Sequence, residues 1–88
     1  MSKAKIEQAL KEFFDPLYLK VIDDSAQHAG HAGAKEGGHF SVEIVSNAFR
    51  AKKPIDRHRM VYAALVPLKN SIHALAIKAR SPDEVYSE

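Results

Sequence analysis

The sequence predicts an α+β domain with the element order helix, strand, strand, helix, strand, in which a three-stranded mixed sheet packs against helices. Two segments carry apolar residues at helical spacing, and three short segments alternate apolar with polar residues. A glycine-rich segment separates the first two strands, and a helix precedes the third. Because 88 residues suit one domain, we expect residues 1–88 to form a single unit.

The first helix is expected over residues 3–14, with Ser2 as its cap. Its apolar positions fall on one helical face, at i, i+4, i+7 and i+8. They are Ile6, Leu10, Phe13 and Phe14. Asp15-Pro16 should end the helix, because a residue before proline resists the helical region.

The first two strands are expected over residues 18–23 and 39–46, as antiparallel partners. In the first, Leu19 and Val21 share one side. Residues 24–38 contain almost no large apolar side chains. A loop of roughly 15 residues is long for a compact domain, and such loops are often functional.

The second helix is expected over residues 55–66, with Pro54 in its first turn and a stop or kink at Pro67. Its core candidates are Ile55, Val61, Leu65 and Leu68. A third strand over residues 72–79 follows this helical crossover, so it can lie parallel to a neighbour. Residues 81–88 are expected to form a polar C-terminal tail.

Composition excludes several functional classes. The chain has no cysteine, which rules out disulfides, thiol nucleophiles and cysteine-only metal sites. No apolar run is long enough to span a membrane, and the polar N-terminus is unlike a signal peptide, so we expect a cytoplasmic protein. A small core leaves little room for a deep catalytic cleft, so we expect no enzyme.

Histidines are the first candidates for chemistry. The chain contains His28, His31, His39, His58 and His73. The two at positions 28 and 31 are flanked by alanine and glycine, and neutral imidazole is a common ligand for zinc, copper and iron. The alternative is a pair of solvated loop histidines.

The histidine at 73 opens the third strand on the side of Leu75 and Ile77, where a half-buried structural role is the alternative. Those at 39 and 58 are expected to be structural or exposed.

Basic residues around the start of the second helix form the other candidate site. They are Arg50, Lys52, Lys53, Arg57 and Arg59. A helix N-terminus with basic side chains can meet phosphate, although cations at this end oppose the helix dipole. The alternative is a solvated charged face. With a net charge of only +2, the chain is not a strongly basic wrap for nucleic acid.

Several segments in series resemble the BolA family. They are Asp24-Ser25, residues 28–33, His39-Phe40, residues 44–46 with Phe49, Arg57-His58-Arg59-Met60-Val61-Tyr62, and Ile72-His73-Ala74-Leu75-Ala76-Ile77 with Pro82. The resemblance runs from about residue 5 to residue 84. It implies an αββαβ domain related to the class II KH topology, in the variant of the family with histidine in the loop. The sequence departs from the family pattern at Lys53, where a serine often caps the helix, and at Pro67, which lies in a helix that the family usually continues.

The resemblance also implies a partner and a cargo. BolA proteins of this kind pair with monothiol glutaredoxins and share a [2Fe–2S] cluster, to which the glutaredoxin cysteine and glutathione supply sulfur. On this chain the ligands would be His73 and either His28 or His31, and the isolated chain would hold no cluster. Some members of the family are DNA-binding regulators, which gives the basic residues an alternative role at double-stranded DNA. A third alternative is a scaffold whose histidines are incidental.

Overall fold

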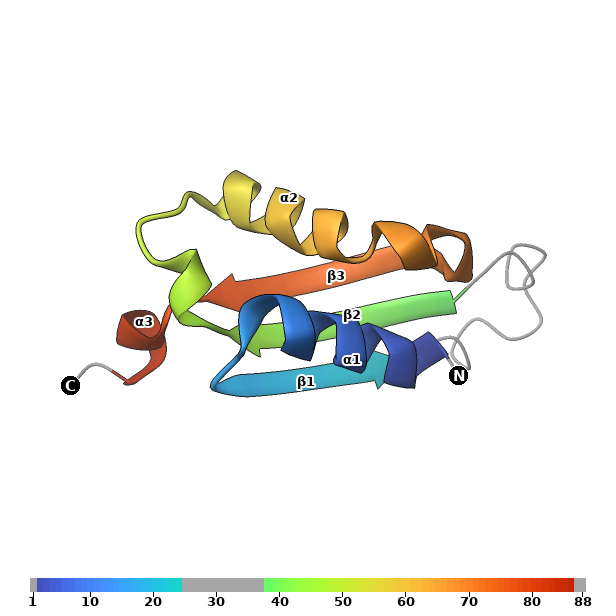
Figure 1. Cartoon of the computed structure of the whole chain (residues 1–88), viewed down its shortest axis with the longest axis horizontal. Helices are drawn as coiled ribbons and strands as arrows, with labels where there is room; N and C mark the ends of the chain where they lie inside the picture. The colour runs from blue at the N-terminus through green and yellow to red at the C-terminus, as the bar shows by residue number, and fades with distance from the viewer. Residues whose placement is uncertain (1, 25–37, 87–88) are drawn as a thin grey trace.

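The computed structural model describes residues 2–24 and 38–86. Its elements are α1 (Ser2–Phe14), β1 (Tyr18–Asp23), β2 (Gly38–Val45), the 3₁₀ helix η3 (Asn47–Phe49), α2 (Pro54–Ala64), the 3₁₀ helix η4 (Val66–Ser71), β3 (Ile72–Arg80) and α3 (Pro82–Tyr86). Figure 1 shows α1 and α2 running along the sheet, with α3 at the end where β3 finishes. The predicted α+β fold with a three-stranded mixed sheet is confirmed.

The sheet has the strand order β1-β2-β3. β1 and β2 pair antiparallel, and β3 runs parallel to β2, as expected for a strand that follows a helical crossover. The β2–β3 ladder is interrupted near its start, because Gly38 pairs with Ile72 whereas His39 pairs with Ala74. His73 is therefore an extra residue in β3, at a β-bulge.

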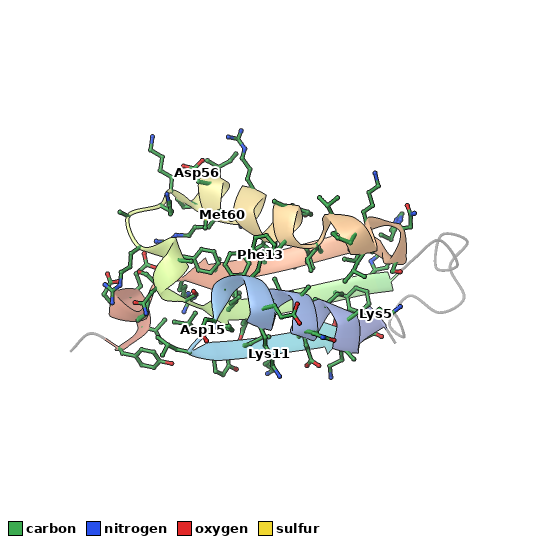
Figure 2. All side chains as sticks on the ribbon, viewed as in Figure 1. Lys5, Lys11, Phe13, Asp15, Asp56 and Met60 are labelled. Atoms are coloured by element: carbon green, nitrogen blue, oxygen red, sulfur yellow. The ribbon has the colours of Figure 1, made fainter. Side chains whose placement is uncertain are left out.

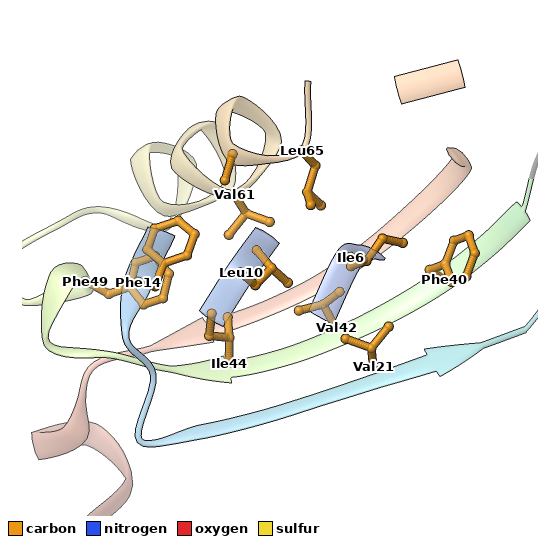
Figure 3. Close-up of a cluster of buried hydrophobic side chains, with 11 residues drawn as sticks. Ile6, Leu10, Phe14, Val21, Phe40, Val42, Ile44, Phe49, Val61 and Leu65 are labelled. Atoms are coloured by element: carbon orange, nitrogen blue, oxygen red, sulfur yellow. The ribbon is translucent and has the colours of Figure 1, made fainter. Parts of the chain in front are cut away.

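The core lies between the sheet and the two long helices. α1 contributes three buried side chains, from Ile6, Leu10 and Phe14. The close-up in Figure 3 shows these side chains among those of the strands, Val61 and Leu65 of the α2 region, and Phe49. The apolar periodicity thus predicted the buried face of α1 correctly at three of its four positions.

Phe13 is the position where that prediction is wrong, because its side chain is 64% exposed. Phe14 occupies the core site at the end of α1, where its ring centroid lies 5.0 Å from that of Phe49. The Phe13 ring packs beside Phe14, with 5.7 Å between centroids (Figure 2 labels Phe13). The end of the helix thus buries one of two adjacent aromatic rings.

α2 begins at Pro54, one residue before the predicted start, and ends at Ala64, two residues before the predicted end, where the chain tightens into η4. Pro67 lies in the first turn of η4, so a stop near this proline is confirmed. Val61 is buried, but Ile55 is 59% exposed. Its prediction as a core residue is wrong because six residues along a helix place it about 120° away from Val61.

Arg57 is a basic residue on the buried side of α2. Its Nε donates to the carbonyl of Lys52 at 2.9 Å, and its Nη1 donates to the carbonyl of Ala79 at 3.0 Å. Nη1 and Nη2 also donate to the two carboxylate oxygens of Glu84, at 2.7 and 3.1 Å. The guanidinium therefore connects the start of α2, the end of β3 and α3.

The expected polar tail over 81–88 is wrong for residues 82–86, which form α3. The Ser81 N–H donates to the Glu84 carboxylate at 2.9 Å, and the Glu84 N–H donates to the Ser81 carbonyl at 3.1 Å. This reciprocal pattern resembles a capping box, and the segment is further tied to α2 by Arg57. The polar sequence did not predict this helix, because the helix is held by an ion pair and not by an apolar face.

The Glu84 network makes stability depend on acid pH. Hydrogen bonds from Arg57, and then from the Ser81 backbone, lower the pKa of Glu84 from 4.5 to about 2. A lowered pKa contributes stability above the unfolded value of 4.5, and this contribution is lost as pH falls towards 2. We expect Glu84→Gln to lower Tm by a few degrees at pH 7, and the difference from the wild type to vanish near pH 2. Thermal unfolding from pH 7 to pH 2 tests this, with Glu12→Gln on α1 as control; a constant difference across that range would contradict it.

Candidate functional site

The structure brings two histidines together at the end of the sheet where β2 and β3 begin. The ring centroids of His39 and His73 are 5.1 Å apart, and the ring planes are inclined by 49°. His73 is exposed and His39 is half-buried, so solvent reaches the pair from the His73 side. The pairing follows from the parallel ladder, which places the starts of both strands at one end of the sheet.

The bulge determines where His73 lies. Counted along an unbroken strand, His73 shares a side with Leu75 and Ile77, which pack against the core. The extra residue in β3 interrupts this alternation, and His73 is exposed beside His39. The expectation that His73 shares the side of Leu75 and Ile77 is therefore wrong.

The other three histidines are not part of this pair. His28 and His31 lie outside the described residues, and their expected role as ligands stays a prediction. His58 is exposed on α2. His39, which was expected to be structural or exposed, lies beside His73. The available signal was that each histidine stands at the start of a strand, and that the two strands were candidates for parallel neighbours.

A hollow of about 330 Å³ lies beside His39. Its lining comes from the ends of all three strands: Asp24, His39, Phe40, Ser41, Ala74, Leu75 and Ala76. The Asp24 N–H donates to the His39 carbonyl at 2.7 Å, and the Ser41 hydroxyl donates to the Asp24 carboxylate at 2.6 Å. These two bonds hold a negatively charged group beside the histidine-bearing strand.

The donor set near His73 is incomplete on this chain. Within residues 2–24 and 38–86, no group of three or more histidine, cysteine, aspartate or glutamate side chains could hold a metal ion. Tetrahedral iron or zinc sites use four ligands in total. An ion or cluster bound through His73 therefore needs further ligands from water, from another molecule or from residues outside 2–24 and 38–86.

The five predicted phosphate-contacting residues do not share one environment. Lys52 and Lys53 are exposed, as are Arg50 and Arg59, whose side chains are 54% and 75% accessible. Arg50 contacts Asp83 at 3.0 Å, and Arg59 lies 3.9 Å from Asp56, which Figure 2 labels on α2. Arg57 differs, because its guanidinium is buried in the network with Glu84. Four of the five basic side chains thus face solvent.

None of the helices in the described part of the chain is long and apolar enough to cross a membrane.

Comparison with known proteins gives a consistent family match. The family model for BolA-like proteins matches residues 10–84. The DNA-binding transcriptional regulator BolA of Escherichia coli is 38% identical over 78 residues, which cover 88% of this chain and 72% of that protein. SufE-like protein 1 of Arabidopsis thaliana, a chloroplastic and mitochondrial protein, is 42% identical over 92% of this chain.

Solved structures agree with the fold. The BolA domain of SufE1 from Arabidopsis thaliana has a TM-score of 0.82 and 45% identity, and the match covers 94% of each chain. BolA1 from the same plant has a TM-score of 0.80 and 34% identity over 96% of this chain and 95% of that one. The chain spans 24% of the full length of the Arabidopsis SufE-like protein and 58% of human BolA-like protein 1.

The exposure of His73 predicts that the site can be altered without loss of the fold. We expect His73→Ala to change the free energy of unfolding by no more than about 0.5 kcal/mol, as for other exposed positions. Leu10→Ala, which removes a fully buried side chain, should cost about 2–5 kcal/mol. Urea unfolding of both variants measures this, and a large loss of stability in His73→Ala would mean that the ring is part of the core.

Proposed function

Because the chain belongs to the BolA family, we propose that it is a non-enzymatic adaptor that pairs with a monothiol glutaredoxin to hold or pass on a [2Fe–2S] cluster. The observation that carries this proposal is the exposed imidazole of His73 on a chain that has no cysteine. Such a chain offers nitrogen ligands and requires another molecule to supply sulfur.

The proposed ligand set is divided between two proteins. His73 supplies one nitrogen, and His28 or His31, both outside the described residues, supplies the second. The glutaredoxin cysteine and glutathione supply the thiolate sulfurs. Replacement of thiolate by neutral imidazole raises the reduction potential of such a cluster, as in Rieske centres. Binding should weaken as pH falls, because protonated imidazole cannot bind iron.

Anaerobic reconstitution tests this function. We expect the chain, mixed with glutaredoxin, glutathione, ferric iron and sulfide, to give a heterodimer whose visible absorption and circular dichroism differ from those of the glutaredoxin homodimer. His73→Ala should abolish the heterodimer spectrum, because one of the two nitrogen ligands is removed. His58→Ala on α2 is the matched control and should leave it intact. His28→Ala and His31→Ala, measured separately, identify the loop ligand.

The proposal is wrong if His73→Ala leaves the heterodimer spectrum unchanged. A heterodimer that forms without a change in spectrum would also contradict it, because the cluster would then remain on glutaredoxin alone.

A second candidate function is binding of double-stranded DNA by a transcription regulator. It is favoured by the exposed cations of Arg50, Lys52, Lys53 and Arg59 around the start of α2. The name of the Escherichia coli relative describes such a regulator. In this proposal the four side chains contact phosphates. Arg57 takes no part, because its guanidinium donors are used within the fold.

Salt-dependent binding tests this second function. We expect Lys52→Gln with Lys53→Gln to weaken duplex binding at low salt, and to reduce the slope of log K against log salt by about 0.9 for each lysine–phosphate pair that the substitutions remove. Lys5→Gln with Lys11→Gln on α1 removes the same charge elsewhere (both are labelled in Figure 2) and should have little effect. Equal weakening in both double variants would show attraction by net charge alone, and no binding at low salt would exclude the function.

A further inference from the structure

We propose that His39 and His73 together bind one divalent transition-metal ion on this chain, without glutaredoxin. Two imidazoles on one tetrahedral ion, each at about 2.0–2.1 Å, have ring centres about 5 Å apart. The observed separation of 5.1 Å matches the spacing that a shared ion requires.

A stacked aromatic pair has a similar separation, so the backbone supplies the second step of the argument. The β-bulge interrupts the alternation that would place His73 with Leu75 and Ile77. Bulges are frequent beside functional sites, where they redirect a side chain. In this chain the bulge brings an exposed imidazole next to a half-buried one, at the cost of a regular ladder.

Charge near the pair also favours a cation. The Asp24 N–H donates to the His39 carbonyl, and its carboxylate accepts from the Ser41 hydroxyl. Because Ser41 and His39 share one side of β2, the Asp24 carboxylate lies on the side of the strand that carries His39. The described residues that line the hollow include Asp24 and no lysine or arginine. Carboxylates near a metal-bound imidazole can also accept its other N–H and raise its basicity.

Two protein ligands leave positions on the ion for water or a small thiol. The expected order of affinity is Cu²⁺ above Zn²⁺, as for nitrogen sites in general. The site would also affect the proposed cluster function, since His73 cannot bind an ion and a cluster at once. That consequence rests on the proposed function, but binding of the ion does not.

Titration of the whole isolated chain with Zn²⁺ tests the site, in the absence of glutaredoxin and glutathione. We expect one ion per chain by calorimetry, and shifts of the His39 and His73 ring resonances in NMR spectra. His39→Ala and His73→Ala should each weaken binding at least tenfold. His58→Ala, and the double variant His28→Ala with His31→Ala, should bind like the wild type. His39→Gln replaces His39→Ala if the latter does not fold, as judged by circular dichroism.

The outcomes separate the alternatives. Loss of binding in the loop double variant, with none in His39→Ala, would place the ion on the loop and overturn the proposal. Absence of binding at Zn²⁺ concentrations well above that of the chain would show that the two rings only stack. Because no glutaredoxin is present, either result leaves the cluster function to be judged by the heterodimer spectrum.

Discussion

The arrangement of α2, β3 and α3 depends on the buried guanidinium of Arg57. It is paired with the carboxylate of Glu84 and donates hydrogen bonds to the carbonyls of Lys52 and Ala79, which lie far from one another in the sequence. The guanidinium is buried, whereas the Glu84 side chain is 43% accessible, so its four hydrogen bonds together hold the three segments as one unit. The C-terminal part of β3 is thereby fixed to the start of α2. The same ion pair anchors residues 82–86 as α3 and withdraws one cation from the surface.

The strand that Arg57 fixes at one end carries the candidate site at the other. β3 begins with Ile72 and His73 and reaches Ala79 only seven residues after Ile72, so its register against β2 relates the two ends. The core of α1 and α2 side chains covers one face of the sheet between them. Stability therefore resides in the core and at the Arg57 end, whereas His73 is exposed. This separation allows a partner to approach the histidines without disturbing the fold.

Sequence patterns predicted the elements well because they depend on local periodicity. The limits of β1, the start of α2 at Pro54 and its end near Pro67 all follow from neighbouring residues. The wrong predictions concern residues whose burial depends on segments that are distant in the sequence. Phe13 and Ile55 are apolar but lie where no element of residues 2–24 and 38–86 covers them. Arg57 has the sequence pattern of a surface cation, and only its contact with Glu84, 27 residues later, shows that it is buried. The bulge at His73 is a property of strand pairing, so no count along β3 could reveal the contact with His39.

The lack of cysteine determines what the histidines can do. A thiolate site would hold iron or zinc on one chain, whereas imidazole ligands alone leave a cluster short of sulfur, which in the proposed function comes from glutaredoxin and glutathione. The imidazoles of His39 and His73 suit a single borderline ion such as Zn²⁺, which needs no sulfur. His73 is common to both arrangements, whereas His39 belongs only to the second. The second nitrogen ligand therefore distinguishes the two proposals. A loop histidine beside His73 indicates a cluster shared with a partner, whereas His39 beside His73 indicates an ion held by this chain alone.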